Sequence, residues 1–437
     1  MLAMLGLLGA LALLIVLTLR GMNLFVATPL CALVVALTSG VAVVEPLAAQ
    51  GQPNLVGAYM GGFTGFIANW FFMFLLGSIF GKLMEDSGAA DAVSRWVTAK
   101  LGMQRAALAV VAACAILTYG GVSLFVVAFS VYPMALALFR EADLPRRFIP
   151  AALAFGSVTF TMTSAGSPEI QNWIPIQYLG TTPYAAWEAS AIVAIFMAAF
   201  GYWWLKRLIA GARARGERFE ARPDDPTGTR EHLPHPALAT IPLAVVLVVS
   251  FIWHDSLKTS ALIMALLAGS GAAWLINLKW LRNPGKAIAD ASTGALIAIG
   301  NTAAVVGFGA VAKLSPAFTV AVEWVTHLPG SPIVSAAIAV SLIAAMTGSA
   351  SGGQAIALPI LAPHFLGMGA NPEQLHRAVA ISSGVLDSLP HNGYVVTTIR
   401  AICGETHRAA YGAVGALTVV VPALGLGLLF VLFALGL

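Results

Sequence analysis

Uninterrupted apolar runs, each of roughly 20 residues, recur from one end of this 437-residue chain to the other. A helix of that length spans the hydrocarbon core of a lipid bilayer. Charged residues make up 10% of the sequence and apolar residues 59%, whereas soluble domains carry roughly 25% charged residues. The runs do not alternate polar with apolar residues, as the strands of a membrane β-barrel would. The sequence therefore predicts an all-α polytopic membrane protein.

Each half of the chain repeats one order of segments, with five spans and one longer apolar block. The first run has no basic region before it, so we expect a span rather than a cleaved signal. One amphipathic stretch in each half, Glu85 to Lys100 and Pro316 to His327, is expected to lie along the membrane interface. Glu85 and Asp86 are expected to cap the first of these stretches. The expected spans are 2–19, 24–44, 59–81, 148–163 and 185–205, then 237–253, 259–277, 290–312, a broken span around 382–393, and 410–435.

The longer apolar blocks are residues 106–139 and 333–366. Each is too long for one span of about 20 residues and too short for two spans with a loop. Small and polar residues interrupt both blocks near the middle, at Thr118 to Ser123 and at Thr347 to Gly353. A re-entrant hairpin, with its tip at the interruption, fits each block best. Such a tip must be buried in protein or line a watery cavity.

A membrane span is also interrupted in its middle at residues 382–393. Pro390 has no amide to donate and disfavours helix at the preceding residue. Asp387 and His391 fall in this break, and an ionisable residue at membrane depth is a functional-site hypothesis. The polar stretch 163–172 is its counterpart in the first half. The alternative is a kinked helix whose polar groups satisfy one another.

Five crossings in each half would place the second half upside down relative to the first, giving two inverted repeats. Positive charges provide a second criterion, since cytoplasmic loops carry an excess of Lys and Arg. On the expected topology all but three of the 23 Lys and Arg residues fall on one face, and the exceptions are Lys258, Lys313 and Arg377. The charge-rich linker 206–236 is therefore predicted to be cytoplasmic and both termini periplasmic.

The positions of the interruptions divide each repeat into two parts. Inverted repeats with paired broken helices are typical of secondary transporters, whose binding site lies at the repeat interface. All four interruptions fall on one part of each repeat, which we expect to move as an elevator-type transport domain against a scaffold. The expected units are the first inverted repeat 1–205 (scaffold 1–105, hairpin and broken span 106–205), the linker 206–236, and the second inverted repeat 237–437 (scaffold 237–332, hairpin and broken span 333–437).

The interruptions are rich in Gly, Ser and Thr, which allow close backbone approach and supply hydroxyl donors. A helix that starts after a break directs unpaired amides and a partial positive charge at the cavity. The breaks thus predict a cradle for a small anion, especially a carboxylate. Bonding of a hydroxyl to its own helix is the alternative for any single Ser or Thr. The expected substrate-binding residues are Tyr119, Gly120, Gly121, Ser123, Thr163, Ser164, Ser167, Thr347, Gly348, Ser349, Ser351, Gly352, Ser388, His391 and Asn392.

Neither hairpin tip contains Lys or Arg, so a bound anion would depend on dipoles and hydroxyls. A coupled proton would help to offset its charge. The candidate proton-coupling residues are Asp387, His391 and Glu169, because His titrates near neutrality and burial favours a neutral carboxyl group. His364 and His376 lie near a predicted membrane edge and are expected to be surface residues.

Several classes of protein are disfavoured by what the sequence lacks. It contains no H-E-x-x-H, G-x-S-x-G, Walker or dinucleotide-binding pattern, so an enzyme is not indicated. Three cysteines in or beside apolar runs predict no disulfide framework and no metal site, and no cofactor is expected. The net charge of +4 reflects sidedness in the membrane rather than nucleic-acid binding. Close helix packing, internal or in a homodimer, is favoured by a G-x-x-x-G-x-x-x-G pattern at Gly57, Gly61 and Gly65.

Two stretches resemble the gluconate:proton symporter (GntP) family of bacterial permeases. They are G-K-L-M-E-D-S-G-A-A at 81–90 and L-D-S-L-P-H-N-G at 386–393. T-G-S-A-S-G-G at 347–353, the Q-A-I-A-L-P after it, and the order of motifs over nearly the whole chain support the resemblance. It implies the ion-transporter superfamily fold and proton-coupled uptake of small hydroxycarboxylates. The superfamily's sodium-coupled carriers have Ser-Asn-Thr at their tips, which these tips lack, so the resemblance implies protons.

These observations predict an inner-membrane symporter that couples protons to uptake of a small hydroxy-monocarboxylate. Candidate substrates are a gluconate-like sugar acid, glycerate and 3-hydroxybutyrate. An antiporter or anion exporter on the same fold is the first alternative. A membrane-embedded sensor or enzyme is the second, and it would call for a signalling domain or a catalytic constellation. The expected partners are the substrate, the proton, the lipid bilayer and a second copy of the chain in a homodimer.

Overall fold

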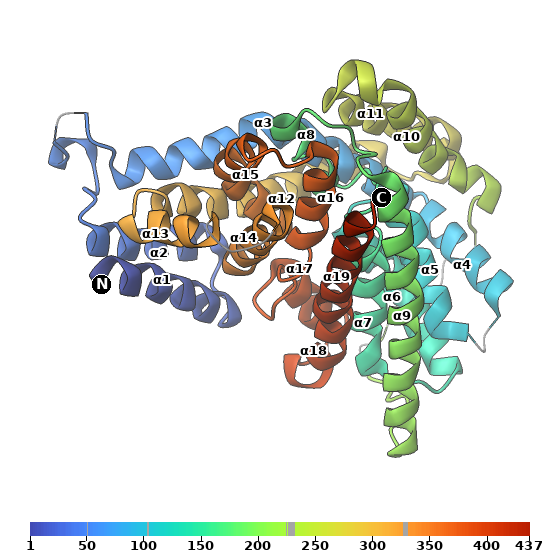
Figure 1. The fold of residues 1–437 in the computed structure, drawn as a ribbon. Helices are drawn as coiled ribbons and strands as arrows, with labels where there is room; N and C mark the ends of the chain where they lie inside the picture. Colours follow the sequence, from blue (N-terminus) through green and yellow to red (C-terminus); the bar gives the residue numbers. More distant parts are fainter. Residues whose placement is uncertain (50, 103–104, 224, 226–231, 327–330) are drawn as a thin grey trace.

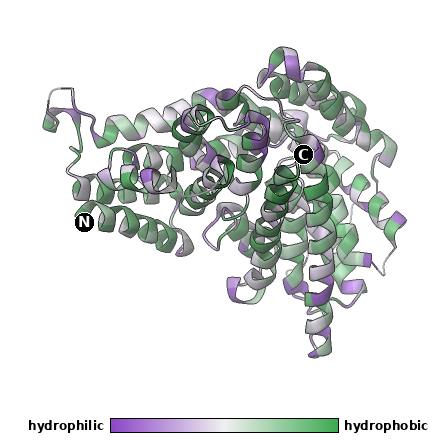
Figure 2. Cartoon of the chain, viewed as in Figure 1, coloured by the Kyte–Doolittle hydropathy of each residue, from purple (hydrophilic) through white to green (hydrophobic). Residues whose placement is uncertain are grey.

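A computed structural model describes the chain except residues 50, 103–104, 224, 226–231 and 327–330 (Figure 1). The described residues fold into helices, as predicted, and an isolated bridge joins Ala42 to Asn54. Seven helices in this part of the chain are long and apolar enough to cross a membrane. Figure 2 shows apolar residues along the helices, with hydrophilic patches gathered towards helix ends and connections. The molecule is therefore a multi-pass membrane protein.

Two long helices cross at the centre of the part expected to be the scaffold. They are α3 (Leu55–Asp86) and α12 (Pro284–Ala312), which pack closely because Gly62 lies against the Val306 carbonyl and Ala310. A methyl group added at Gly62 would lie 2.7 Å from the Ala310 side chain, whereas Gly61 faces open space. The surrounding helices are α1 (Leu2–Leu19), α2 (Leu24–Ser39), α10 (Pro236–Leu257) and α11 (Ser260–Asn277).

Both long apolar blocks form helical hairpins with tips where the sequence predicts them. The first hairpin comprises α5 (Ala106–Tyr119) and α6 (Leu124–Glu141), and the second comprises α14 (Pro332–Thr347) and α15 (Ala350–Gly367). The amphipathic stretches that precede them form α4 (Ala89–Leu101) and α13 (Pro316–Thr326), and His327 lies outside the described residues.

The expected caps of α4 have a different role. Glu85 and Asp86 belong to the last turn of α3, where they form ion pairs with Lys82 at 3.3 and 3.0 Å. The prediction that they cap the interfacial stretch is therefore wrong, because helix α3 runs on past the expected end of its span. The three glycines of the pattern do not supply the close packing: among the described residues, a methyl group added at Gly57, Gly61 or Gly65 would meet no other helix, whereas one added at their neighbour Gly62 would clash with α12.

Both expected broken spans lose their helical structure in the middle. We call residues 160–175 the first break and residues 384–392 the second break. The first break follows α7 (Ile149–Ala154) and its π-helical continuation Phe155–Thr159, and it leads into α8 (Ile176–Leu179). The second break separates α16 (Pro372–Ser383) from α17 (Gly393–Val396), which continues as the π-helical segment Thr397–Ile402. A long helical segment follows each broken span. It is α9 (Trp187–Ala214) in the first half, and α18 (His407–Gly415) followed by α19 (Val421–Ala434) in the second half.

The order of elements in the second half follows that of the first. In each half three scaffold helices lead to an amphipathic helix, a hairpin, a broken span and a terminal helix. Helices α9 and α19 pack together, which brings the ends of the two halves side by side (Figure 1). The division into inverted repeats and the elevator motion stay predictions.

The linker differs from a simple flexible connection. Helix α9 continues to Ala214, and residues 217–223 and Asp225 then contact the stretch between α6 and α7 of the first half and, in the second half, residues 404–405 after the broken span. Arg146, which precedes α7, forms ion pairs with Asp225 of the linker at 3.0 Å and with Glu405 of the second half at 3.2 Å. Arg222 of the linker also pairs with Glu405, at 2.7 Å. Asp224 and residues 226–231 of the expected linker lie outside the described residues.

Charges in the linker region determine how its carboxyl groups titrate. The hydrogen bond from Arg147 holds the pKa of Glu217 below its usual range. Burial acts to raise the pKa of Asp225, but the backbone amide of Arg222 and the Arg146 guanidinium outweigh it and lower that pKa. Both carboxyl groups are therefore ionised at neutral pH, and the linker contacts are ion pairs there.

Candidate functional site

The second break is built by caps and side-chain bonds from the same half of the chain. The Asn392 side chain accepts a bond from the Val395 amide, starting α17, and donates to the Gly348 carbonyl at 2.9 Å. The His391 imidazole lies 3.0 Å from the Ala345 carbonyl and packs beneath Gly348. Asn392 and His391 thus fasten the break to the tip of the second hairpin.

The tip of the second hairpin brings a helix N-terminus to the same place. Gly348 has a positive φ of 60°, a backbone conformation that glycine adopts without strain. Ser349 then caps α15, where its hydroxyl accepts the Gly352 amide at 3.1 Å. Asp387 faces the backbone amide of Ala350, the first residue of α15, and accepts a bond from the Ser388 hydroxyl at 2.9 Å. A carboxyl group therefore lies at the positive end of a helix dipole.

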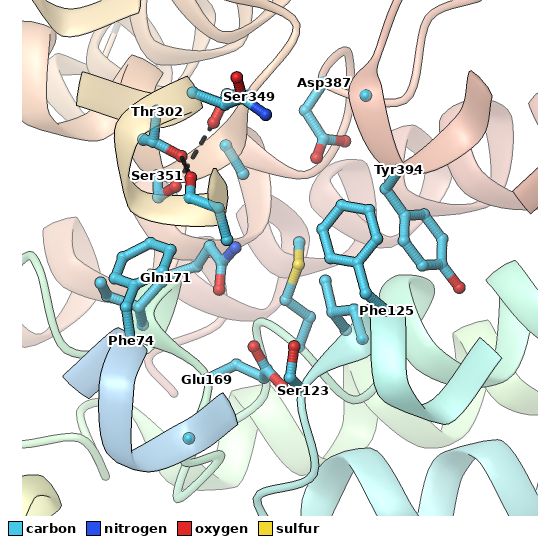
Figure 3. A pocket seen from close by; sticks show the side chains of 18 of the residues that line it. Phe74, Ser123, Phe125, Glu169, Gln171, Thr302, Ser349, Ser351, Asp387 and Tyr394 are labelled. Atoms are coloured by element: carbon cyan, nitrogen blue, oxygen red, sulfur yellow. Dashed lines mark hydrogen bonds between the residues drawn. The ribbon is translucent and has the colours of Figure 1, made fainter. Parts of the chain in front are cut away.

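Both hairpin tips and both breaks meet around one cavity of about 230 Å³ (Figure 3). Scaffold helices α3, α11 and α12 complete its wall through residues such as Phe74, Leu262 and Thr302. Ten of the residues predicted for the site line it: Gly121, Ser123, Glu169, Thr347, Gly348, Ser349, Ser351, Asp387, Ser388 and Asn392.

The charged groups of the cavity are all acidic among its described lining residues. Glu169 comes from the first break and Asp387 from the second, and Figure 3 shows them on opposite sides of the space. No Lys, Arg or His is among the described residues that line it. Positive potential comes instead from the backbone, because the N-termini of α6 and α15 lie here: Ser123 is the N-cap of α6, Ser349 is the N-cap of α15, and each of these helices has 18 residues.

Seven predicted site residues do not line this cavity. Tyr119 donates its hydroxyl hydrogen bond to the Ala165 carbonyl. The Ser164 hydroxyl bonds back to the Phe160 carbonyl four residues earlier, which is the local bonding foreseen as the alternative for Ser and Thr. Ser167 accepts the Glu169 amide at 3.3 Å and so shapes the loop that presents that acid. The full set is Tyr119, Gly120, Thr163, Ser164, Ser167, Gly352 and His391.

Other polar residues of the cavity were not among the predicted site residues. Asn301 and Thr302 project from α12 in the scaffold, and Gln171 and Tyr394 lie within or just after the breaks. Asn301 is a polar residue in an otherwise apolar span, which is a signal that could have marked it. Gln171 lies within the polar stretch 163–172, but irregular backbone offers no periodicity that would tell which side chains face inward.

One expectation for the edge of the membrane is wrong. His376 was expected at the surface, but it is fully buried, and its Nδ1 lies 2.6 Å from the Thr181 hydroxyl oxygen. Arg377, counted as a charge on the periplasmic face, is also fully buried. His364 is exposed, as expected.

Comparison with known proteins shows what the chain is similar to. The family model described as GntP family permease matches residues 1–208. A Bacillus subtilis (strain 168) protein described as uncharacterized transporter YxjC is 33% identical, over 94% of this chain and 94% of that protein. An uncharacterized transporter from Haemophilus influenzae is 29% identical, over 78% of this chain and 80% of that protein.

Two solved structures share the fold at low sequence identity. MtrF of Neisseria gonorrhoeae, whose structure is described as illuminating a class of antimetabolite efflux pumps, has a TM-score of 0.52 and 15% identity over 95% of this chain and 94% of its own. The YdaH transporter of Alcanivorax borkumensis has a TM-score of 0.54 and 17% identity over 95% of this chain and 98% of its own. The fold is therefore one that transporters use.

Proposed function

Because the chain belongs to the GntP family of permeases and is a transporter rather than an enzyme, we propose that it couples protons to the uptake of a small hydroxy-monocarboxylate. The substrate site is the cavity between the two breaks. Glu169 and Asp387 hold the coupled proton, and the hydroxyls and amides of the hairpin tips hold the substrate. The candidates are a gluconate-like sugar acid, glycerate and 3-hydroxybutyrate.

The observation that carries the proposal is the pair of acids in a cavity whose described lining contains no basic side chain. A carboxylate that enters this space meets two carboxyl groups, and like charges a few ångströms apart repel strongly away from bulk water. Protonation of Glu169 or Asp387 reduces that repulsion. Anion and proton then bind together, which is the coupling a symporter requires.

The cavity also supports the size and chemistry of the substrate. Its volume of about 230 Å³ lies below the 300–1,000 Å³ range typical of drug-sized ligands. The amides at the starts of α6 and α15 favour a carboxylate. The hydroxyls of Ser123, Ser349 and Ser351 can donate to, or accept from, the hydroxyl groups of a hydroxyacid.

The broader setting of the proposal follows from the sequence. The protein lies in the bacterial inner membrane with its linker in the cytoplasm and both termini in the periplasm, as the distribution of Lys and Arg favours. The hairpins and broken spans move as one body against the scaffold in an elevator-type cycle. Gly57, Gly61 and Gly65 form an open face of small residues on α3, where a second copy could pack in a homodimer.

Transport by purified protein in liposomes tests the proposal. Radiolabelled glycerate, 3-hydroxybutyrate and gluconate are supplied outside in potassium buffer at acid pH, with and without sodium. We expect at least one of them to accumulate without sodium, and accumulation to collapse when a protonophore dissipates the pH gradient. Accumulation that requires sodium would contradict proton coupling. Outward movement of the labelled acid against its gradient would favour the antiporter or exporter.

A further inference from the structure

Side chains of the second half bind both breaks, so the second break is held within its own half and the first break is held across the two halves. Side chains of the second half hold the second break: His391 and Asn392 bind hairpin carbonyls, and the Tyr411 hydroxyl donates to the Ser388 carbonyl at 3.2 Å. The first break is also held by side chains of the second half. The source of these contacts is α15 and α16, far from the first break in sequence.

Arg377 on α16 makes the largest share of these contacts. Its guanidinium is fully buried and donates to the Asn172 side-chain oxygen at 2.9 Å, to the Ala185 carbonyl at 3.0 Å and to the Thr163 carbonyl. It also donates to the Pro183 carbonyl at 3.2 Å. Among the described residues no carboxylate lies within ion-pair distance of Arg377, and the oxygens that accept its hydrogen bonds all belong to residues 163–185.

Two further buried side chains of the second half bind the same region. Gln354 on α15 donates to the Gln171 carbonyl at 3.0 Å and to the Ser383 hydroxyl at 2.9 Å. His376, next to Arg377, meets the Thr181 hydroxyl at 2.6 Å. All three side chains have no exposed surface, so their hydrogen bonds are protected from water.

These contacts lie on both sides of Glu169. Arg377 binds Thr163 before the acid and Asn172 after it, and Gln354 binds the carbonyl of Gln171, two residues beyond it. Fixed points before and after a short irregular loop determine where its middle can lie. Donors of the second half thus act together with first-half donors, such as Asn172 and Trp173 at the Ser167 carbonyl, in placing this acid in the cavity.

We propose that Arg377 is a positioning residue for transport, which together with Gln354 sets the place of Glu169 in the substrate cavity. The inference rests on the proposed function of that cavity. The planar guanidinium is required because its five donors have a fixed fork geometry, whereas a lysine ammonium is a point charge on a flexible stem. Arg377 does not itself touch the substrate, and it acts through the shape of the first break.

A double-mutant cycle separates positioning from general stability. The KM for glycerate uptake by liposomes, with 3-hydroxybutyrate and gluconate in parallel, is measured against external pH for Arg377→Lys, Glu169→Gln and the double variant. We expect Arg377→Lys to raise KM about tenfold, or roughly 1.4 kcal/mol of binding free energy. We expect Glu169→Gln to flatten the pH dependence of KM, because the amide mimics the protonated acid. The double variant should be no worse than either single variant.

A second pair covers the case in which Arg377→Lys does not fold. Gln354→Met keeps the length of the side chain and removes the donor to the Gln171 carbonyl. It should raise KM several-fold by itself, and it should cause no further rise in KM when it is combined with Glu169→Gln. Gln374→Met is the matched control, because Gln374 lies on α16 and its side-chain amide donates to the Leu437 carbonyl, away from the first break. It should leave KM unchanged.

The outcomes discriminate between the two proposals. Effects that multiply in the double variants, with the pH dependence of Glu169→Gln itself flattened, would overturn the positioning role and leave the proposed function standing. A Glu169→Gln protein that keeps the wild-type KM and pH dependence would contradict the proposed function, and the positioning role would fail with it.

Discussion

An ion-pair network centred on Arg146 joins the linker to both halves of the chain. The Arg146 side chain is only 7% exposed, and it pairs with Asp225 at 3.0 Å and Glu405 at 3.2 Å. It also donates to the Tyr132 hydroxyl at 3.3 Å and to the Glu220 carbonyl at 3.1 Å. Replacement of Arg146 by Met keeps much of the side-chain volume and removes all of these donors.

The structure sets the size of the expected effect. Removal of one partner from a buried ion pair costs about 3–5 kcal/mol, since the other charge is left buried. Asp225 would keep Arg140 at 3.2 Å, and Glu405 would keep Arg222 at 2.7 Å. We therefore expect the lower end, about 3 kcal/mol. At roughly 2 °C per kcal/mol for a large domain, the Tm should fall by roughly 6 °C.

Thermal unfolding in detergent, followed by intrinsic fluorescence, measures this shift. Arg218→Met is the matched control, because Arg218 pairs with Asp143 at 3.2 Å but both side chains are 51% exposed. Exposed pairs contribute about 0–1 kcal/mol, so the control should lower Tm by less than about 2 °C. Equal Tm values for the two variants would refute the view that buried charges fix the linker to the residues before α7 and after the second broken span.

Three other predictions concern pH, packing and motion. The pKa of Asp225 is lowered in the folded protein. The ionised carboxylate therefore stabilises the fold at neutral pH, and this stabilisation is lost as the pH falls through the lowered pKa. The Tm difference between wild type and Asp225→Asn should be constant from about pH 5 to 8 and shrink below about pH 4. Gly62→Ala should destabilise by about 1–3 kcal/mol because α3 and α12 must separate, whereas Gly61→Ala, which faces open space, should not lower Tm. A disulfide between Gly309→Cys on α12 and Ile356→Cys on α15, which are in contact, should stop transport in a background without the native cysteines, and reduction should restore it; full transport with the disulfide formed would contradict the elevator motion.

Local sequence signals located the interruptions accurately. Pro390 and the glycines near it predicted a break that the structure places at residues 384–392, and the second hairpin turns at Gly348, inside the predicted stretch. These features depend on backbone chemistry within a few residues: Pro lacks an amide, and Gly allows a positive φ. The division into helices was accurate for the same reason, because apolar length alone determines most spans.

The inward-facing side chains of the breaks were harder to predict. Thr163 and Ser167 lie in a polar stretch but face away from the cavity, because irregular backbone has no fixed side-chain period. The burial of Arg377 was missed because its acceptors, such as the Asn172 side chain, lie about 200 residues earlier in the chain. In a sequence, a charged residue near a membrane edge is expected at the membrane surface, because the loop that would bury it cannot be identified.

The most direct test of the account is whether protons enter the liposome together with the substrate. A pH-sensitive dye is trapped inside liposomes that contain the protein, with no initial pH gradient and potassium as the only alkali cation, and glycerate, 3-hydroxybutyrate or gluconate is added outside. The account predicts that the transported acid acidifies the interior, and that Asp387→Asn abolishes the acidification while exchange of labelled for unlabelled substrate continues. Substrate uptake without a change in internal pH, or Asp387→Asn protein that acidifies the interior like wild type, would contradict it.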